Sequence, residues 1–370
     1  MSRSAPLWLS APTRFAALTR WQARVAILVI LAVLALTITA LAVPTPEALD
    51  AATGGERHQT DLMLYDAIAA GVRGGGNYYA VAADAMRAGG YPLKPFLTMR
   101  LPALASVLAA LPLWAAPLLQ LLLVLCVAAT WMLRLHGALG RSLPMLVGGI
   151  LLAGSMLAFI QPGLISFHEI WAGLLVAWSL GLRRPGRWVE PAAIALAAML
   201  IRETASLYAV IMLVFAWRDG ERREAMGWTL VLALFGVALA FHAWAVTGLA
   251  GPLDARSPGW LGLEGIGLFV KSIVLGTALQ LAPLWLGALL VGASAIGWAS
   301  WRDPLAARMI AIIAAYGALI SIFARIDTFY WGLMVAPVFL LGLIFLPDAL
   351  RDLVAQATEK RRITVTRVAR

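Results

Sequence analysis

The chain has 370 residues, of which 62% are hydrophobic and 13% are charged, and its mean hydropathy is +0.85. A soluble protein of this length cannot bury that much apolar surface, so lipid must solvate most of the chain. The formal net charge of +10 fits a membrane protein whose Lys and Arg residues mark its cytoplasmic side, and we expect no nucleic-acid partner. The single Cys126 excludes a disulfide within the chain and a thiolate metal site.

The first apolar stretch covers residues 25–43 and follows Arg14, Arg20 and Arg24. It is too long for the core of a signal peptide and long enough to cross a bilayer once, so we interpret it as an uncleaved transmembrane helix. Further apolar stretches that can cross the membrane are 113–133, 143–160, 165–182, 226–246, 281–299, 305–324 and 330–346.

Residues 190–217 differ from the other apolar stretches because Arg202 and Glu203 lie near their middle. Basic clusters flank both ends, so an even number of crossings must separate them if both clusters are cytoplasmic. Two short helices that meet at Arg202 and Glu203 satisfy this condition. The sequence therefore predicts an all-α, polytopic integral membrane protein with about ten transmembrane helices, one short hairpin among them, in a single membrane domain over residues 1–370.

The distribution of basic residues orients the predicted bundle. The segments assigned to the cytoplasm carry twenty of the 29 Lys and Arg residues, as the positive-inside rule requires. Both termini are therefore expected in the cytoplasm. The basic tail, residues 348–370, is expected to lie on anionic lipid.

Two of the predicted outer segments are long. Residues 44–112 form the first periplasmic loop, in which Thr60 and Asn77 can each cap a helix and Pro102 and Pro112 bound a third short one. We expect these amphipathic helices to lie along the outer leaflet. Residues 248–280 form a second, turn-rich periplasmic loop that leads into an amphipathic run with Lys271.

Ionisable side chains at membrane depth gather on the predicted outer side. They are Asp61, Asp66, Lys94, Arg100, His168, Glu169, Arg202, Glu203, His242, Arg325 and Asp327. Such groups are costly in a bilayer and usually functional. A transporter would place them near the midplane and along a path to both faces, so this one-sided distribution favours an outward-facing cavity.

Asp61 is the candidate catalytic base. It follows Thr60 at the start of a predicted helix, where the helix dipole favours a carboxylate, and it could accept a proton from a hydroxyl nucleophile. The alternative is an Asp that only starts the helix. Asp66 is a weaker candidate, one turn further on.

Several cations are candidates for binding a phosphate or pyrophosphate group: Lys94, Arg100, Arg202, Arg256 and Lys271. Contact with lipid headgroups is the alternative for each of them. His168 and Glu169 are adjacent, so their side chains point about 100° apart on a helix and no shared metal site is expected. Trp171, Trp260, Tyr330 and Trp331 fit an aromatic belt, with a sugar-binding platform as the second interpretation.

Two stretches, "DLMLYDAIAAGV" and "NYYAVAADAMRAGGYPLKPFLTMRLP", resemble the first-loop pattern of bacterial GT-C-type membrane glycosyltransferases. That pattern has a Tyr pair, an Ala-rich helix, Gly, and then Tyr-Pro and a basic residue. The segments "SPGW" and "DTFYWGLMVAP" are similar to outer-loop features of the same family. Many members carry an acidic pair, or an Asp immediately before the Tyr pair, where this chain has Gly74 to Asn77.

The resemblance implies inverting transfer of a sugar from a polyprenyl-phosphate donor to a lipid or glycan acceptor, at the periplasmic face of a bacterial inner membrane. Asp61 would activate the acceptor hydroxyl, and Arg202, Lys94 or Arg100 would hold the phosphate leaving group. The full set of candidate substrate-binding residues is Asp66, Tyr78, Tyr79, Lys94, Arg100, His168, Glu169, Arg202, Glu203, Arg256 and Asp327.

Other functions stay open at this point. They are a lipid-linked glycan polymerase or ligase, a transporter or flippase, and a non-catalytic membrane protein. The cofactor also stays open, with a divalent cation as one option.

Overall fold

The computed structural model describes residues 6–44 and 61–359, and in those ranges the chain is helical and forms no strand. The α-helices are α1 (Arg20–Thr37), α3 (Asp61–Arg73), α4 (Tyr78–Ala88), α5 (Ala103–Ala110), α6 (Ala115–Ala138), α7 (Ser142–Ser155), α8 (His168–Leu182), α9 (Val189–Ile201), α10 (Ser206–Arg218), α11 (Arg222–Leu249), α12 (Ile266–Leu275), α13 (Leu284–Ser300), α14 (Pro304–Phe323) and α15 (Leu346–Thr358). Short 3-10 helices include η2 (Ile38–Ala42), η3 (Phe96–Thr98), η8 (Ile326–Met334) and η9 (Ala336–Phe345).

Among the described residues, four helices are long and apolar enough to cross a membrane: Arg20–Ala42, Ala115–Ala138, Arg222–Leu249 and Pro304–Phe323. A fifth span results if Ile326–Met334 and Ala336–Thr358, which meet at an angle of 66°, are counted together. Helices α7, α9 and α13 are apolar but shorter than these spans. The structure thus supports an all-helical membrane protein with four or five full-length spans, and the count of ten remains a prediction.

The predicted hairpin is present as two short helices. α9 ends at Ile201 and α10 begins at Ser206, with a single 3-10 turn between them. The turn holds Glu203, and Arg202 precedes it directly.

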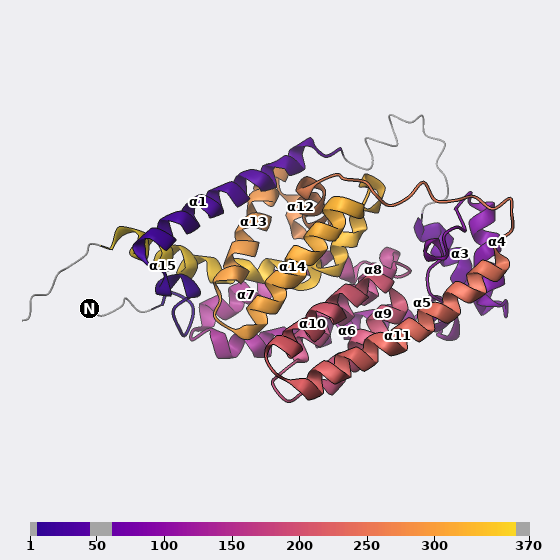
Figure 1. Ribbon diagram of the computed structural model, residues 1–370, viewed down its shortest axis with the longest axis horizontal. Coiled ribbons are helices and arrows are strands. Elements are labelled where there is room, and N and C mark those ends of the chain that lie inside the picture. The colour runs from indigo at the N-terminus through magenta and orange to yellow at the C-terminus, as the bar shows by residue number, and fades with distance from the viewer. Residues whose placement is uncertain (1–5, 45–60, 360–370) are drawn as a thin grey trace, which may run out of the picture.

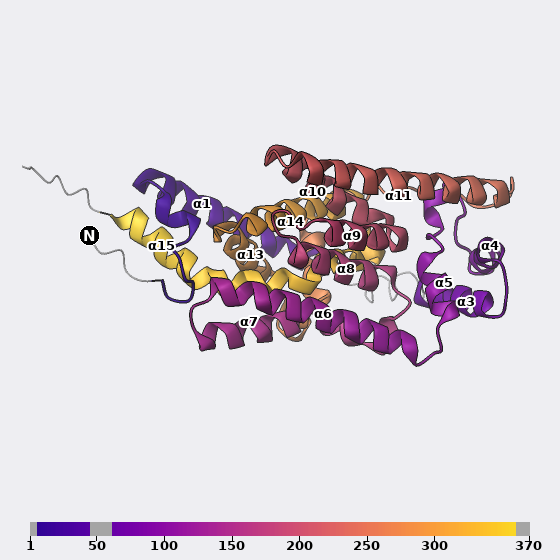
Figure 2. The same cartoon turned by 90° about the horizontal axis from the view of Figure 1, so that it is seen from below.

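The long helices run along the long axis of the molecule, which gives the bundle two distinct ends (Figure 1). The N-terminal segment and α15 lie at one end, which we call the terminal end. Helices α3, α4 and α5 and the last turns of α11 lie at the other, which we call the cavity end (Figure 2). Thr60 and residues 360–370 of the basic tail lie outside the described residues.

A buried carboxylate ties the two terminal segments together. Asp348, at the start of α15, accepts hydrogen bonds from the backbone N–H groups of Leu7, Trp8 and Leu9 at 2.6, 2.8 and 2.8 Å. Because three N–H groups converge on it, this carboxylate is satisfied without leaving the core. Both described ends of the chain therefore lie on one side of the bundle.

Small residues let the central helices approach closely. A Cβ atom added to Gly297 of α13 would lie 1.8 Å from the carbonyl oxygen of Gly342 in η9, and one added to Gly173 of α8 would lie 2.3 Å from that of Leu333. Ser294 and Trp298 both donate to the carbonyl oxygen of Phe339. Close approach of this kind is how helices associate in lipid, where hydrophobic burial drives little.

Helix α4 begins and ends as its sequence predicts. The Asn77 side chain accepts hydrogen bonds from the N–H groups of Tyr79 and Ala80 at 3.0 and 3.4 Å, and the helix ends before Gly89. The sequence predicts that the apolar face of this helix rests on the membrane, and the structure differs on this point. Ala82 and Met86 pack with α3 and with Val246 of α11, so protein rather than lipid covers this face.

Candidate functional site

A cavity of about 260 Å³ lies at the cavity end of the bundle. It is enclosed by α3, α4, α5, the start of α8, the loop around residues 257–260 and η8. Its polar lining comes from Asp61, Tyr65, Tyr78, Tyr91, Arg100, Ser166, His168, Ser257, Arg325, Asp327, Thr328 and Tyr330. The structure thus brings residues from four distant parts of the sequence to one polar space.

Asp61 lies at the first position of α3 and lines the cavity. Its carboxylate accepts a hydrogen bond from the Tyr330 hydroxyl at 2.5 Å. The N-terminus of α3 adds its positive dipole end to the surroundings of the carboxylate. Asp61 is therefore held in a fixed position, and its carboxylate keeps acceptor capacity for a second partner.

Tyrosine hydroxyls surround Asp61. Burial raises the pKa of Tyr65 to about 12. Burial, and next the charge of Asp61, raise the pKa of Tyr91. Both phenols therefore stay protonated at neutral pH and can donate a hydrogen bond.

Four ionised side chains form what we call the buried quartet: Arg100, Glu169, Arg202 and Glu203. Arg202 Nε lies 2.6 Å from Glu169 Oε1, and Arg202 Nη1 also contacts Glu203. Arg100 lies 3.8 Å from Glu169 and 3.6 Å from Glu203. Arg202 is 1% exposed and Glu169 is not exposed at all. Two positive and two negative charges balance here, as burial in a low-dielectric interior requires.

The quartet changes how Arg202 is understood. The sequence predicts Arg202 as a phosphate ligand, but the structure places it behind the cavity wall, with two carboxylates and with its guanidinium 5.4 Å from the ring centre of Trp331. Glu169 and Glu203 likewise lie behind the wall. Arg100 is the one member of the quartet that lines the cavity, and its Nε donates to the Tyr65 hydroxyl at 3.0 Å.

Several other predicted residues lie away from the cavity lining. Lys94 donates to the carbonyl oxygen of Gly251 at 2.5 Å and so ties the loop after α11 to the first-loop segment. Arg256 is exposed beside it. Asp66 accepts a hydrogen bond from Ser166. Tyr79 packs against His242, with ring centres 5.7 Å apart.

Lys271 also has a role that its sequence context did not indicate. It is buried in α12 and donates to the carbonyl oxygen of Val43, directly after η2. The positive charge of Lys271 stabilises the partial negative charge at the C-terminal end of the first span. Lys271 therefore anchors that helix and does not line the cavity.

His168 lines the cavity with its ring edge against Tyr65, 4.7 Å between ring centres. Its Nδ1 is buried and has no hydrogen-bond partner among the described residues. In the same part of the chain, no group of three or more His, Cys, Asp and Glu side chains could hold a metal ion.

Several polar residues of the lining were not among the predicted site residues: Tyr65, Tyr91, Thr98, Ser166, Ser257, Arg325, Thr328 and Tyr330. Of these, Arg325 was expected on the outer side of the bundle but was given no role in binding. Arg325 pairs with Asp327 through two contacts, at 3.2 and 2.9 Å, and remains 40% exposed at the cavity. Tyr65 carried a usable signal, because it follows Asp61 by four residues on one helix and so shares its face. Ser166 and Tyr91 lie in connecting segments, where no periodicity indicates which way a side chain points.

The chain matches no protein-family model, no curated protein and no solved structure in the three comparisons made. The fold and the site therefore define its class on their own. It is an all-helical membrane protein that holds a cavity lined by acidic and basic side chains at one end of an apolar bundle.

Proposed function

We propose that this protein is a glycosyltransferase that moves a sugar from a polyprenyl-phosphate donor to a hydroxyl acceptor, with inversion. One observation carries the proposal: Asp61 lines the same cavity as Arg100 and Arg325. A carboxylate that can take a proton and guanidinium groups that can face a phosphate are the two polar functions that this reaction needs.

The proposed reaction is a single displacement. Asp61 accepts the proton of the acceptor hydroxyl while that oxygen forms a bond to the anomeric carbon of the sugar. The bond between that carbon and the phosphate oxygen breaks, and the lipid phosphate leaves with the electron pair. Attack from the face opposite the leaving group inverts the anomeric configuration.

The tyrosines and arginines take distinct roles in this proposal. Tyr330 fixes the orientation of the Asp61 carboxylate through its hydrogen bond. Arg100 and Arg325 stabilise the negative charge that develops on the leaving phosphate. Arg202 is a positioning residue, because it holds Glu169 and Glu203, which in turn face Arg100.

The proposed location follows from the charge distribution. The terminal end carries most of the basic segments, so we place it in the cytoplasm and the cavity at the periplasmic face of a bacterial inner membrane. Single cysteines test this placement in a Cys126→Ser background. Asp327→Cys should react with an impermeant maleimide from outside the cell, and Arg187→Cys should react only after the membrane is opened. The reverse pattern would overturn the orientation.

The activity itself is tested with the purified full-length protein and a polyprenyl-phosphate donor carrying a labelled sugar. We expect label to move to an added lipid or glycan acceptor, and no transfer when the donor is a soluble sugar nucleotide. Solute flux across proteoliposomes without donor turnover would overturn the proposal in favour of a transporter.

A further inference from the structure

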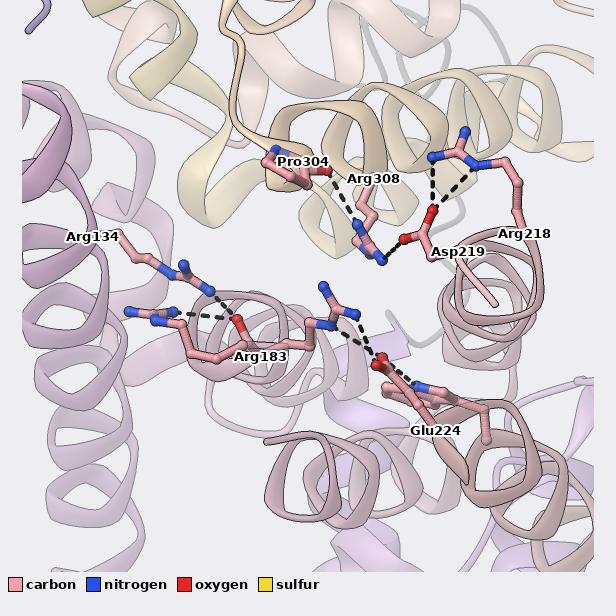
Figure 3. Close-up of polar contacts among 9 residues, drawn as sticks. Arg134, Arg183, Arg218, Asp219, Glu224, Pro304 and Arg308 are labelled. Carbon is pink, nitrogen blue, oxygen red and sulfur yellow. Dashed lines mark hydrogen bonds and ion pairs between the residues drawn. The ribbon is translucent and has the colours of Figure 1, made fainter. Parts of the chain in front are cut away.

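A second group of charged residues lies at the terminal end, far from the cavity in the fold, and the proposed function does not use it. We call it the basic cluster: Arg134, Arg183, Arg218 and Arg308, with the carboxylates Glu224 and Asp219 (Figure 3), together with Arg184. Its members come from α6, α10, α11, α14 and the segment that follows α8.

Three arginines share the two carboxylates. Arg183 binds Glu224 through two hydrogen bonds, at 3.0 and 2.7 Å. Arg308 Nη2 lies 2.6 Å from Asp219, and Arg218 donates to the same side chain at 3.3 Å. One positive charge among these three arginines therefore has no carboxylate of its own.

The remaining two arginines, Arg134 and Arg184, bind a carbonyl oxygen at the C-terminal end of α8. Arg134 Nε donates to the carbonyl oxygen of Gly181 at 2.9 Å, and Arg184 Nη1 donates to the same oxygen at 2.8 Å. These contacts place two cations at the negative end of the α8 dipole. Neither residue needs a ligand, and the surplus charge lies with Arg183, Arg218 and Arg308.

One buried donor in the cluster has no hydrogen-bond partner among the described residues, and a free donor of a neighbouring arginine faces it. Arg308 is 1% exposed, and its Nε has no hydrogen-bond partner among the described residues. Arg183 uses Nε and Nη2 on Glu224, and no hydrogen bond from its Nη1 is found in the same part of the chain. Figure 3 shows the two guanidinium groups on facing elements, with this free nitrogen of Arg183 directed toward Arg308. A buried guanidinium that keeps a free donor beside a second positive charge is costly unless an anion lies between the two.

We propose that a phosphate group binds between Arg183 and Arg308, and that it belongs to the headgroup of an anionic membrane lipid. The surroundings favour a lipid over a soluble ligand. Trp217 is 78% exposed next to Arg218, and Phe215 lies under the guanidinium groups of Arg218 and Arg308 at 4.3 and 4.9 Å. An exposed Trp beside clustered arginines is typical of the membrane interface, where acyl chains meet phosphate.

The test uses the full-length protein in nanodiscs made of phosphatidylcholine alone or with added phosphatidylglycerol. We expect phosphatidylglycerol to raise the unfolding temperature of the wild-type protein and Arg308→Gln to abolish most of this rise. Retention of the lipid in native mass spectrometry should fall roughly tenfold in the variant, as expected for loss of a charge-assisted contact. Arg87→Gln, which removes an exposed arginine at the cavity end, is the matched control and should keep the full response.

A second variant separates a lipid site from a purely structural cluster. Asp219→Asn removes the carboxylate that competes for Arg308 and Arg218, so the proposal predicts tighter retention of phosphatidylglycerol. Weaker or unchanged retention in this variant, or an equal response of the wild-type protein to both lipids, would overturn the proposal. If inorganic phosphate reproduces the full effect in phosphatidylcholine discs, the bound phosphate does not need to come from a lipid. That result would overturn the proposal of a lipid headgroup.

Discussion

The two ends of the bundle use the same kinds of side chain in different proportions. The buried quartet at the cavity end sets two arginines against two glutamates, whereas the basic cluster at the terminal end sets five arginines against two carboxylates. An arginine in an apolar sequence therefore does not by itself indicate a ligand. Arg202 contacts two carboxylates of the chain, whereas Arg308 shares its one carboxylate, Asp219, with Arg218.

The largest expected effect comes from removing the acid at the centre of the quartet. Glu169→Gln leaves Arg202 and Arg100 facing a neutral amide in a buried position, and we expect the free energy of unfolding to fall by about 3–5 kcal/mol. Denaturant titration in detergent measures this loss. Glu203→Gln is the control, and its loss should be smaller because that side chain is 18% exposed. Wild-type stability of Glu169→Gln would show that the quartet does not hold the cavity wall.

A smaller effect is expected at an arginine that lines the cavity without being buried. Arg325→Gln should raise the KM for the polyprenyl-phosphate donor roughly tenfold, since one charge-assisted contact to phosphate is lost. The unfolding temperature should stay unchanged, because Arg325 is 40% exposed. An unchanged KM would remove Arg325 from the site.

At the terminal end, an arginine that binds carbonyl oxygens should contribute less to the free energy of unfolding than one that binds a buried carboxylate. Arg134→Met removes a cation from the C-terminal end of α8, and we expect a loss of about 1 kcal/mol in the free energy of unfolding. Sugar transfer should be retained. A loss as large as that of Glu169→Gln would mean that the arginines at the two ends do not differ in how strongly the fold depends on them.

The smallest expected effect depends on pH and concerns the exposed rim of the cavity end. The hydrogen bond from Arg87, then that from the Gly251 N–H, lower the pKa of Asp254 from its usual 3.8 to about 2. Because the folded-state pKa is depressed, this contact stabilises the rim above about pH 4 and is lost as the pH falls through about 2. Hydrogen exchange of the Gly251 amide should accelerate over that window. Arg87→Gln should move the acceleration to higher pH, and an unmoved profile would contradict the assignment.

Much of the fold could be predicted from the sequence. The apolar stretches, the break at Arg202 and the cap at Asn77 are local signals, and the structure has helices that end or begin there. The packing face of α4 was predicted less well, since a helix with one apolar side can rest on lipid or on protein with the same periodicity. Only the positions of α3 and α11 in space decide between them.

The site was predicted in part for a similar reason. Asp61, Arg100, His168 and Asp327 line one cavity, as expected for polar groups on one side of the bundle. The sequence could not show that Glu169 neutralises Arg202, because these residues belong to different helices. It also could not show that Lys94 donates a hydrogen bond to the carbonyl oxygen of Gly251, which lies more than 150 positions away along the chain.

Asp61 is the central residue of the proposed mechanism, and one pair of variants tests its role directly. Asp61→Asn keeps an oxygen that can accept the Tyr330 hydrogen bond but cannot take up the proton, so kcat for sugar transfer should fall by about 10²–10⁴-fold with the unfolding temperature unchanged. Asp66→Asn, one turn further along α3 and outside the cavity lining, should stay within a few-fold of the wild type. Full activity of Asp61→Asn, or an equal loss in both variants, would contradict the proposal that Asp61 is the catalytic base.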